Sequence, residues 1–113
     1  MNREAPHTGE IAQRLAAVVD GLKHAGFWEL PRPPESAFEN MGAFGMNTMA
    51  FATWLRWVFV PNVEARIASD GPWPSSSSVA AQAVREFDGD TDPGVLDLRS
   101  ALSDLDTLFG PSE

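Results

Sequence analysis

Side chains that bind metals or act in catalysis are sparse in this sequence. The chain has no cysteine, which excludes thiolate metal ligands and thiol chemistry. Its two histidines, His7 and His24, are too far apart to match the paired spacing of a zinc site. No serine lies in the Gly-x-Ser-x-Gly turn of a hydrolase, and the sequence has no glycine-rich phosphate-binding loop. We therefore expect no catalytic residue, no metal site and no cofactor.

Three aspartates at alternate positions, Asp88, Asp90 and Asp92, look like the opening of a calcium-binding loop. An EF-hand loop needs Gly at its sixth position and a bidentate Glu at its twelfth. Pro93 and Arg99 occupy those positions here, and an arginine in place of the bidentate ligand would repel the ion. We interpret the aspartates as a solvated turn in which Asp92 caps a helix that begins at Pro93.

Aromatic residues are the unusual feature of the sequence, which has four tryptophans and seven phenylalanines. Arg56 lies between Trp54 and Trp57 in an otherwise apolar run, so its guanidinium needs a carboxylate, a carbonyl or water. Pro61 has no N–H to donate to the carbonyl of Trp57, which leaves a second polar group without its usual partner. Core packing explains such aromatics most simply, but tryptophans also anchor partners at interfaces.

Two binding hypotheses follow from this cluster. In the first, the aromatic side chains anchor a protein partner. In the second, a small anionic ligand lies in a pocket between the Phe44–Asn47 loop and the Trp54–Trp57 helix, with Arg56 contacting the anion. Both hypotheses use the same candidate residues, which are Phe44, Asn47, Thr48, Trp54, Arg56 and Trp57.

Hydrophobic spacing predicts two helices that flank and carry these residues. The first runs from about Thr8 to Ala25. The second begins at a cap formed by Asn47 or Thr48, is kinked at Pro61 and continues to about Ser69. Because the second helix is apolar on nearly every face, we predict that it is buried at the centre of the fold.

Two further helices complete the predicted fold. One spans Val79–Phe87, with the last one or two residues of Ser75–Ser78 as its cap, and the other runs from Pro93 to about Phe109. The segment 29–47 contains prolines and glycines, and we expect its apolar side chains to hold it against the core. The sequence therefore predicts a single all-α domain over residues 1–113, an irregular four-helix bundle with a core of about 10–110.

The charge of the chain limits the classes of partner that it can bind. The 113 residues carry a net charge of −8 without a stripe of Lys and Arg, so we expect no direct binding to nucleic acid. No apolar run is long enough for a membrane helix, and no basic segment precedes an apolar stretch at the N-terminus, which favours a cytoplasmic protein that does not bind membranes. Residues 86–113 hold eight acidic side chains against one arginine. This end is either a solvated surface or a region that steers the chain to a basic protein.

Several motifs together resemble a known protein family. They are Phe44-x-x-Asn47-Thr48-Met49, the run Trp54-Leu55-Arg56-Trp57-Val58-Phe59-Val60-Pro61, Trp28, Trp73-Pro74 and Leu105-Asp106-Thr107-Leu108-Phe109. Over about residues 10–110 the chain resembles the YqcC-like family of small bacterial proteins. The resemblance implies a compact helical bundle. It also implies a link to a tRNA pseudouridine synthase, because the genes of family members often lie beside the gene for that enzyme.

The sequence departs from the family pattern at Asn47, where the family has Asp before the threonine. An amide does not take up a proton at neutral pH, so Asn47 cannot act as a general base, whereas Asn caps a helix as well as Asp does. We therefore predict a non-enzymatic binding or accessory protein whose partner is a basic protein, such as a tRNA-modifying enzyme. A binder of small anionic ligands is the alternative, and a hydrolase or transferase is the third hypothesis.

Overall fold

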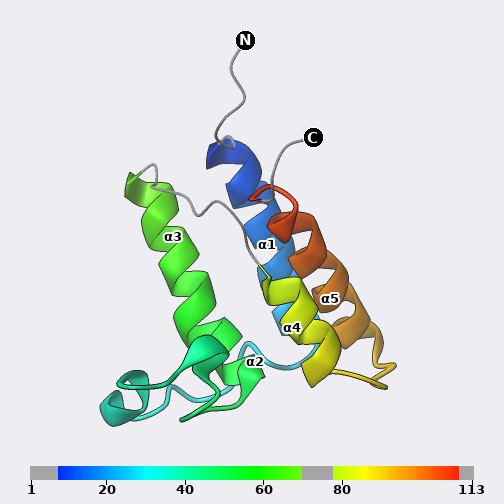
Figure 1. Cartoon of the computed structure of the whole chain (residues 1–113). Coiled ribbons are helices and arrows are strands. Elements are labelled where there is room, and N and C mark those ends of the chain that lie inside the picture. The colour runs from blue at the N-terminus through cyan, green and yellow to red at the C-terminus, as the bar shows by residue number, and fades with distance from the viewer. Residues whose placement is uncertain (1–7, 70–77, 110–113) are drawn as a thin grey trace.

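The computed structural model describes residues 8–69 and 78–109 of the chain. Within these residues all regular structure is helical and no strand is present, as the sequence predicts. Figure 1 shows α3 beside the pair formed by α1 and α5, with α4 in front of them. The first helix is α1 (Thr8–His24). The second is one continuous helix with three parts: α2 (Phe51–Trp54), a π-helical segment (Leu55–Phe59) and α3 (Val60–Ser69). The last two helices are α4 (Val79–Glu86) and α5 (Pro93–Asp106).

The first helix, α1, has the bounds that the sequence predicts to within a residue. Its core-facing side chains recur at helical spacing, and the chain leaves the helix through Gly26, whose φ of 83° favours glycine. The Phe27 N–H donates to the Leu22 carbonyl at 2.8 Å, and the Gly26 N–H donates to the Lys23 carbonyl at 3.1 Å. These two bonds satisfy the last carbonyls of α1 and direct the following chain back towards the core.

The predicted start of the second helix is wrong by a few residues. The helix begins at Phe51 with Ala50 as its N-cap, and no side chain caps it. Asn47 and Thr48 lie in the preceding turn, where their own N–H groups donate to the carbonyls of Met41 and Gly45. Their side chains bond to loop carbonyls instead of the helix end, because Ser, Thr and Asn can bond to whichever nearby backbone groups the chain brings to them.

The second helix passes through Pro61 without a break in its helical conformation. Just before the proline it widens into the π-helical segment, in which the N–H of Val60 reaches the carbonyl of Leu55, five residues back. A π-helical turn is one way in which a helix accommodates an interruption of its hydrogen-bond ladder, and Pro61 supplies that interruption. A bend at Pro61 stays a prediction.

The last two helices are capped by aspartates. As predicted, Asp92 is the N-cap of α5, and its Oδ1 accepts hydrogen bonds from the N–H groups of Gly94 at 2.8 Å and Val95 at 3.3 Å. The predicted serine cap of α4 is wrong at Ser78, whose side chain makes no capping bond. The Oδ2 of Asp106, near the end of α5, instead accepts from the N–H of Ala80 at 2.7 Å. The remaining serines, 75–77, and the Trp73-Pro74 motif lie outside the described residues.

The core centres on α1 and α5, which run in opposite directions and share the most extensive contact between helices. Two glycines permit this close approach. A Cβ placed on Gly21 would lie 2.8 Å from the Cα of Leu98, and one placed on Gly94 would lie 2.5 Å from the carbonyl oxygen of His24. Only a residue without a side chain fits at these crossings.

The structure therefore corrects the prediction that the tryptophan-bearing helix is the buried centre. That helix packs one side against the core, whereas the side chains of Trp54 and Trp57 stay half-buried. α1 and α5 take the centre because their backbones approach closely at Gly21 and Gly94 and because both helices contribute fully buried side chains. The core side chains of the second helix are Phe51, Leu55, Val58, Val60 and Val63.

Candidate functional site

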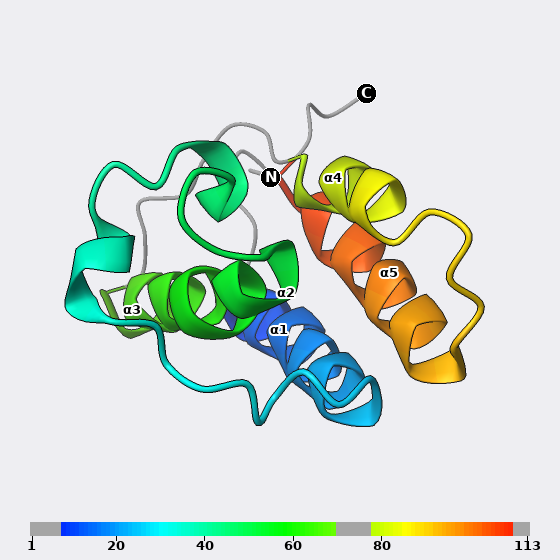
Figure 2. The ribbon, with the colours of Figure 1, turned by 90° about the horizontal axis from the view of Figure 1, so that it is seen from below.

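The candidate polar residues Asn47 and Thr48 hold the long connection between α1 and α2 in shape. Figures 1 and 2 show this connection wrapped around the α2 end of the molecule. The Thr48 hydroxyl donates to the carbonyl of Ala37 at 2.6 Å, and the Asn47 amide Nδ2 donates to the carbonyl of Asn40 at 3.2 Å. Both residues are exposed, and their polar groups are used in joining distant parts of one loop.

The candidate aromatic residues Phe44 and Trp54 contact each other directly. Their ring centroids are 5.4 Å apart in an edge-to-face arrangement, and Phe44 also meets Phe51 edge-to-face at 6.1 Å. Gly45, with a φ of 70°, brings the loop so close that a Cβ there would lie 2.8 Å from Trp54 Cδ1. The loop therefore rests on this part of the helix, as predicted for Phe44, although Met46 is 65% exposed.

Arg56 is held between two tryptophans, one of which sequence reasoning did not place beside it. Its guanidinium carbon lies 3.7 Å from the centroid of the Trp28 ring and 4.2 Å from that of Trp57. The Nε–H donates to the carbonyl of Trp28 at 2.7 Å, and the indole N–H of Trp57 donates to the carbonyl of Leu30 at 2.9 Å. The predicted carbonyl partner of Arg56 is thus the backbone that follows α1.

The structure divides the six candidate residues into three groups. Asn47 and Thr48 tie the loop to itself, Phe44 and Trp54 pack together, and Arg56 and Trp57 fasten the segment Trp28–Leu30 to the helix. All three arrangements order the connection between α1 and α2. The signal for the third group is Trp28, a large aromatic residue placed shortly after the end of α1.

Two grooves of the described surface lie on either side of α5. One, of about 540 Å³, runs between α4 and α5 and is lined by Ala80, Ala81, Val84, Leu96, Arg99, Ser100 and Ser103. A second, of about 520 Å³, runs between α1 and α5 and is lined by Ala17, Asp20, Gly21, His24, Asp97, Ser100, Ala101 and Asp104. Ser100 borders both grooves, so together they form one surface across the outer side of α5, which we call the α5 face.

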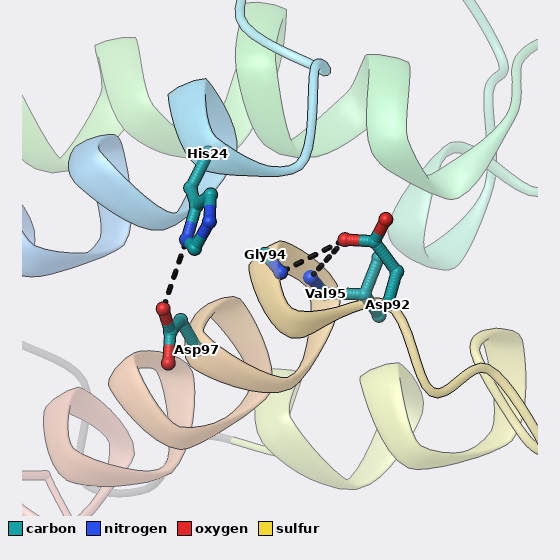
Figure 3. Close-up of polar contacts among 5 residues, drawn as sticks. All are labelled: His24, Asp92, Gly94, Val95 and Asp97. Atoms are coloured by element: carbon teal, nitrogen blue, oxygen red, sulfur yellow. Dashed lines mark hydrogen bonds and ion pairs between the residues drawn. The ribbon is translucent and has the colours of Figure 1, made fainter.

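Polar contacts at one end of the α5 face join α1 to α5. Figure 3 shows His24, at the end of α1, beside Asp97 of α5, with 2.9 Å between Nδ1 and Oδ2. Both side chains are more than half exposed, so this pair contributes about 1 kcal/mol at most. In the same view the Asp92 carboxylate accepts from the backbone of Gly94 and Val95. Within residues 8–69 and 78–109, no three His, Asp or Glu side chains come close enough together to hold a metal ion.

Sequence similarity places the chain in a family. Residues 10–108 match a family of proteins that carries the description "tRNA pseudouridine synthase C". The chain belongs to this family, DUF446. The resemblance to YqcC-like proteins is confirmed, because this DUF446 member is 27% identical over 99 residues to the "Uncharacterized protein YqcC" of Escherichia coli strain K12. That match covers 88% of the chain and 90% of the relative.

Two further relatives differ greatly in how much of their own length is matched. An "Uncharacterized protein" of Haemophilus influenzae is 27% identical over 81 residues, which cover 69% of the chain and 76% of the relative. The "tRNA pseudouridine synthase C" of Pectobacterium carotovorum is 33% identical over 76 residues, which cover 67% of the chain. This DUF446 chain spans only 19% of the Pectobacterium protein.

No solved structure matches the chain. Among the described helices of this DUF446 member, none combines the length and apolar character needed to cross a bilayer.

Proposed function

We propose that this chain is a non-enzymatic accessory domain that binds a tRNA pseudouridine synthase. The observation that carries the proposal is the arrangement in the Pectobacterium relative. There a segment similar to this chain makes up 19% of a protein named for the synthase, so most of that protein lies outside the similar segment. Covalent linkage holds two modules at a high effective concentration. In this proposal the chain carries a surface that binds such a synthase.

The charge of the chain fits a protein partner with a basic surface. Of the net charge of −8, residues 86–113 supply −7, from eight acidic side chains against one arginine. Enzymes that act on tRNA carry Lys and Arg to neutralise phosphates, so a basic surface is a general property of such a partner. Opposite charges on two proteins speed their encounter and fix their orientation. The chain therefore supplies an acidic surface to an enzyme of opposite charge.

Isothermal titration calorimetry tests the proposal. The purified full chain is titrated into purified tRNA pseudouridine synthase C from the same organism, at low and at high salt. We expect saturable binding that weakens as salt screens the opposite charges. In a parallel assay, the chain alone should form no pseudouridine in tRNA. The proposal is overturned if no binding is measured at either salt concentration, or if the chain alone modifies tRNA.

A binder of small anions is the second candidate, and the setting of Arg56 favours it. Tryptophan rings cover the guanidinium and its Nε is bonded to the Trp28 carbonyl, but its Nη atoms have no partner among the described residues. A carboxylate or phosphate could accept from that edge with two parallel bonds. In this hypothesis the ligand lies between the Phe44–Asn47 loop and the Trp54–Trp57 helix, and the six candidate residues surround it.

A thermal-shift screen against anionic metabolites tests this second candidate. A stabilising compound should lose most of its effect with Arg56→Gln, which removes the charge and keeps much of the side chain. Arg32→Gln is a matched control, because Arg32 is exposed and pairs only with Glu35 and the Phe38 ring among the described residues. If the Arg56→Gln variant shows the same thermal shift as the wild type, Arg56 does not bind the anion and this candidate site is overturned.

A further inference from the structure

We propose that the α5 face is the docking surface and that its occupant is a basic amphipathic helix of the synthase. The inference rests on the proposed function and adds the surface and the chemistry of the partner. The occupant's apolar side chains fill the groove between α4 and α5, and its Lys and Arg side chains lie over the groove between α1 and α5. The two grooves meet along α5 at Ser100.

The groove between α4 and α5 is the apolar half of this surface. Val84 is 49% exposed and Leu96 is 44% exposed, and they are two of only three large apolar side chains exposed to this degree among the described residues. Both line the same groove, whose remaining walls include Ala80 and Ala81. Small residues leave room for a helix to approach, and a groove of this kind is a common site for the apolar face of a partner helix.

The groove between α1 and α5 is the acidic half. Asp20, Asp97 and Asp104 line it, no Lys or Arg is among its lining residues, and its one histidine, His24, contacts Asp97 at 2.9 Å. The carboxylates of Asp20 and Asp104 make no ion pair or hydrogen bond with any described residue. They are therefore available to Lys or Arg from a partner. Because Ser100 lines both grooves, the acidic groove lies next to the apolar one, and an occupant of both needs an apolar side next to a basic side.

The negative charge of the chain favours a basic helix over a second copy of the chain or a nucleic acid. A second copy of this chain would bring acidic side chains opposite each other in a molecule of net charge −8, which opposes pairing through this face. Nucleic acid is repelled for the same reason. A basic helix with one apolar side complements both halves of the surface. Arg99, which lines the groove with Leu96 and Ser103, can donate to carbonyls at the C-terminal end of that helix.

Two double variants, each with its own control variant, test the inference by calorimetry with the purified synthase and the full chain. Val84→Ser/Leu96→Ser removes the apolar contacts, and Asp20→Asn/Asp104→Asn removes two charges without breaking a described contact. Met46→Ser is the control for the first, since Met46 is the third exposed apolar residue and lies in the loop before α2. Glu39→Gln/Glu64→Gln is the control for the second, with two exposed carboxylates on other elements. Circular dichroism verifies that each variant keeps the helical content of the wild type.

We expect the apolar variant to weaken binding about 10-fold or more, as truncation of anchor residues does. The charge variant should weaken it about 5-fold at about 0.05 M NaCl and much less at about 0.5 M, where screening acts over a few ångströms. Both controls should bind as the wild type does. This pattern supports the α5 face.

The alternative outcomes separate the two proposals. If the wild type binds and both α5-face variants bind equally well, the docking surface is overturned and the accessory function stands. If the wild type does not bind, the accessory function fails and the docking surface fails with it. If sedimentation shows a dimer of the chain that Leu96→Ser dissociates, the groove belongs to a second copy and the inference is again overturned.

Discussion

Gly21 and Gly94 are the residues on which the central helix pair depends. Each lies where α1 and α5 cross, and each would bring a Cβ within 2.8 Å of backbone on the other helix. Neither position is marked in the sequence, because a glycine in a helical stretch usually indicates only a local loss of stability. Their importance appears only when the crossing is known.

Replacing Gly94 by alanine should destabilise the fold by about 2 kcal/mol or more, because the new methyl group meets the His24 carbonyl and the helices must separate. Gly9→Ala is the control. Gly9 also lies in a helix, but a Cβ there has nothing within 4 Å, so the change should stabilise the protein by about 0.5 kcal/mol. The free energy of unfolding in urea measures both. Equal effects for the two variants would contradict the close crossing of α1 and α5.

Asp92 provides a second test at a single side chain. Asp92→Ala should lower the free energy of unfolding by about 1 kcal/mol, because the first N–H groups of α5 lose their acceptor. Asp88→Ala is the matched control in the same acidic turn, since Asp88 is exposed and caps no described helix. Urea unfolding of the two variants measures the difference. A loss of the same size in both would show that net charge, and not the cap, sets the stability.

The connection between α1 and α2 is ordered by contacts that reach across the element boundary. Trp28 and Trp57 enclose Arg56, and two backbone carbonyls of the connection accept from side chains of the second helix. Cation–π contacts of this kind contribute about 0.5–1 kcal/mol each where the residues are partly exposed. The long connection therefore follows the second helix closely even though it has little regular structure.

Trp57→Phe should loosen this connection, because phenylalanine keeps a ring and removes the indole N–H that bonds to the Leu30 carbonyl. We expect faster hydrogen exchange at the amide of Leu30, which donates to the Phe27 carbonyl, and a loss of about 1 kcal/mol in the free energy of unfolding. Trp54→Phe is the control, since the Trp54 indole makes no hydrogen bond with the described residues. Exchange at Leu30 that is unchanged by Trp57→Phe, or equally raised by Trp54→Phe, would contradict the role of this bond.

Regular elements were predictable from the sequence, whereas their contacts were not. Helices leave local patterns in the sequence. Two examples are the apolar spacing of Ile11, Leu15 and Leu22 in α1 and the Asp92-Pro93 start of α5. The start at Phe51 was missed because Asn47 and Thr48 have the chemistry of caps but find loop carbonyls first. A carbonyl was among the predicted partners of Arg56, but its identity as that of Trp28 was not predictable, because a carbonyl 28 residues away leaves no pattern in the sequence.

In the whole molecule, two of the three exposed large apolar side chains of the described residues, Val84 and Leu96, lie beside a groove lined by aspartates. The sequence predicted the wrong central helix, because a helix that is apolar on nearly every face looks buried all round. In the structure, part of the tryptophan-bearing helix is covered by the connection between α1 and α2, through aromatic contacts such as that of Phe44 with Trp54. The α1–α5 pair forms the core instead and leaves the outer side of α5 facing solvent. That side combines Val84 and Leu96 with Asp20 and Asp104, whose carboxylates pair with none of the described residues, and we propose it as the surface for a basic helix.

Nuclear magnetic resonance of the isotope-labelled full chain gives the decisive measurement. Unlabelled tRNA pseudouridine synthase C from the same organism is added, and changes at each backbone amide of the chain are followed. We predict changes concentrated in residues 17–24, 80–84 and 96–104, which line the two grooves of the α5 face. No change at a saturating concentration of the synthase would contradict the accessory function, and changes confined to residues 28–57 would contradict the α5 face.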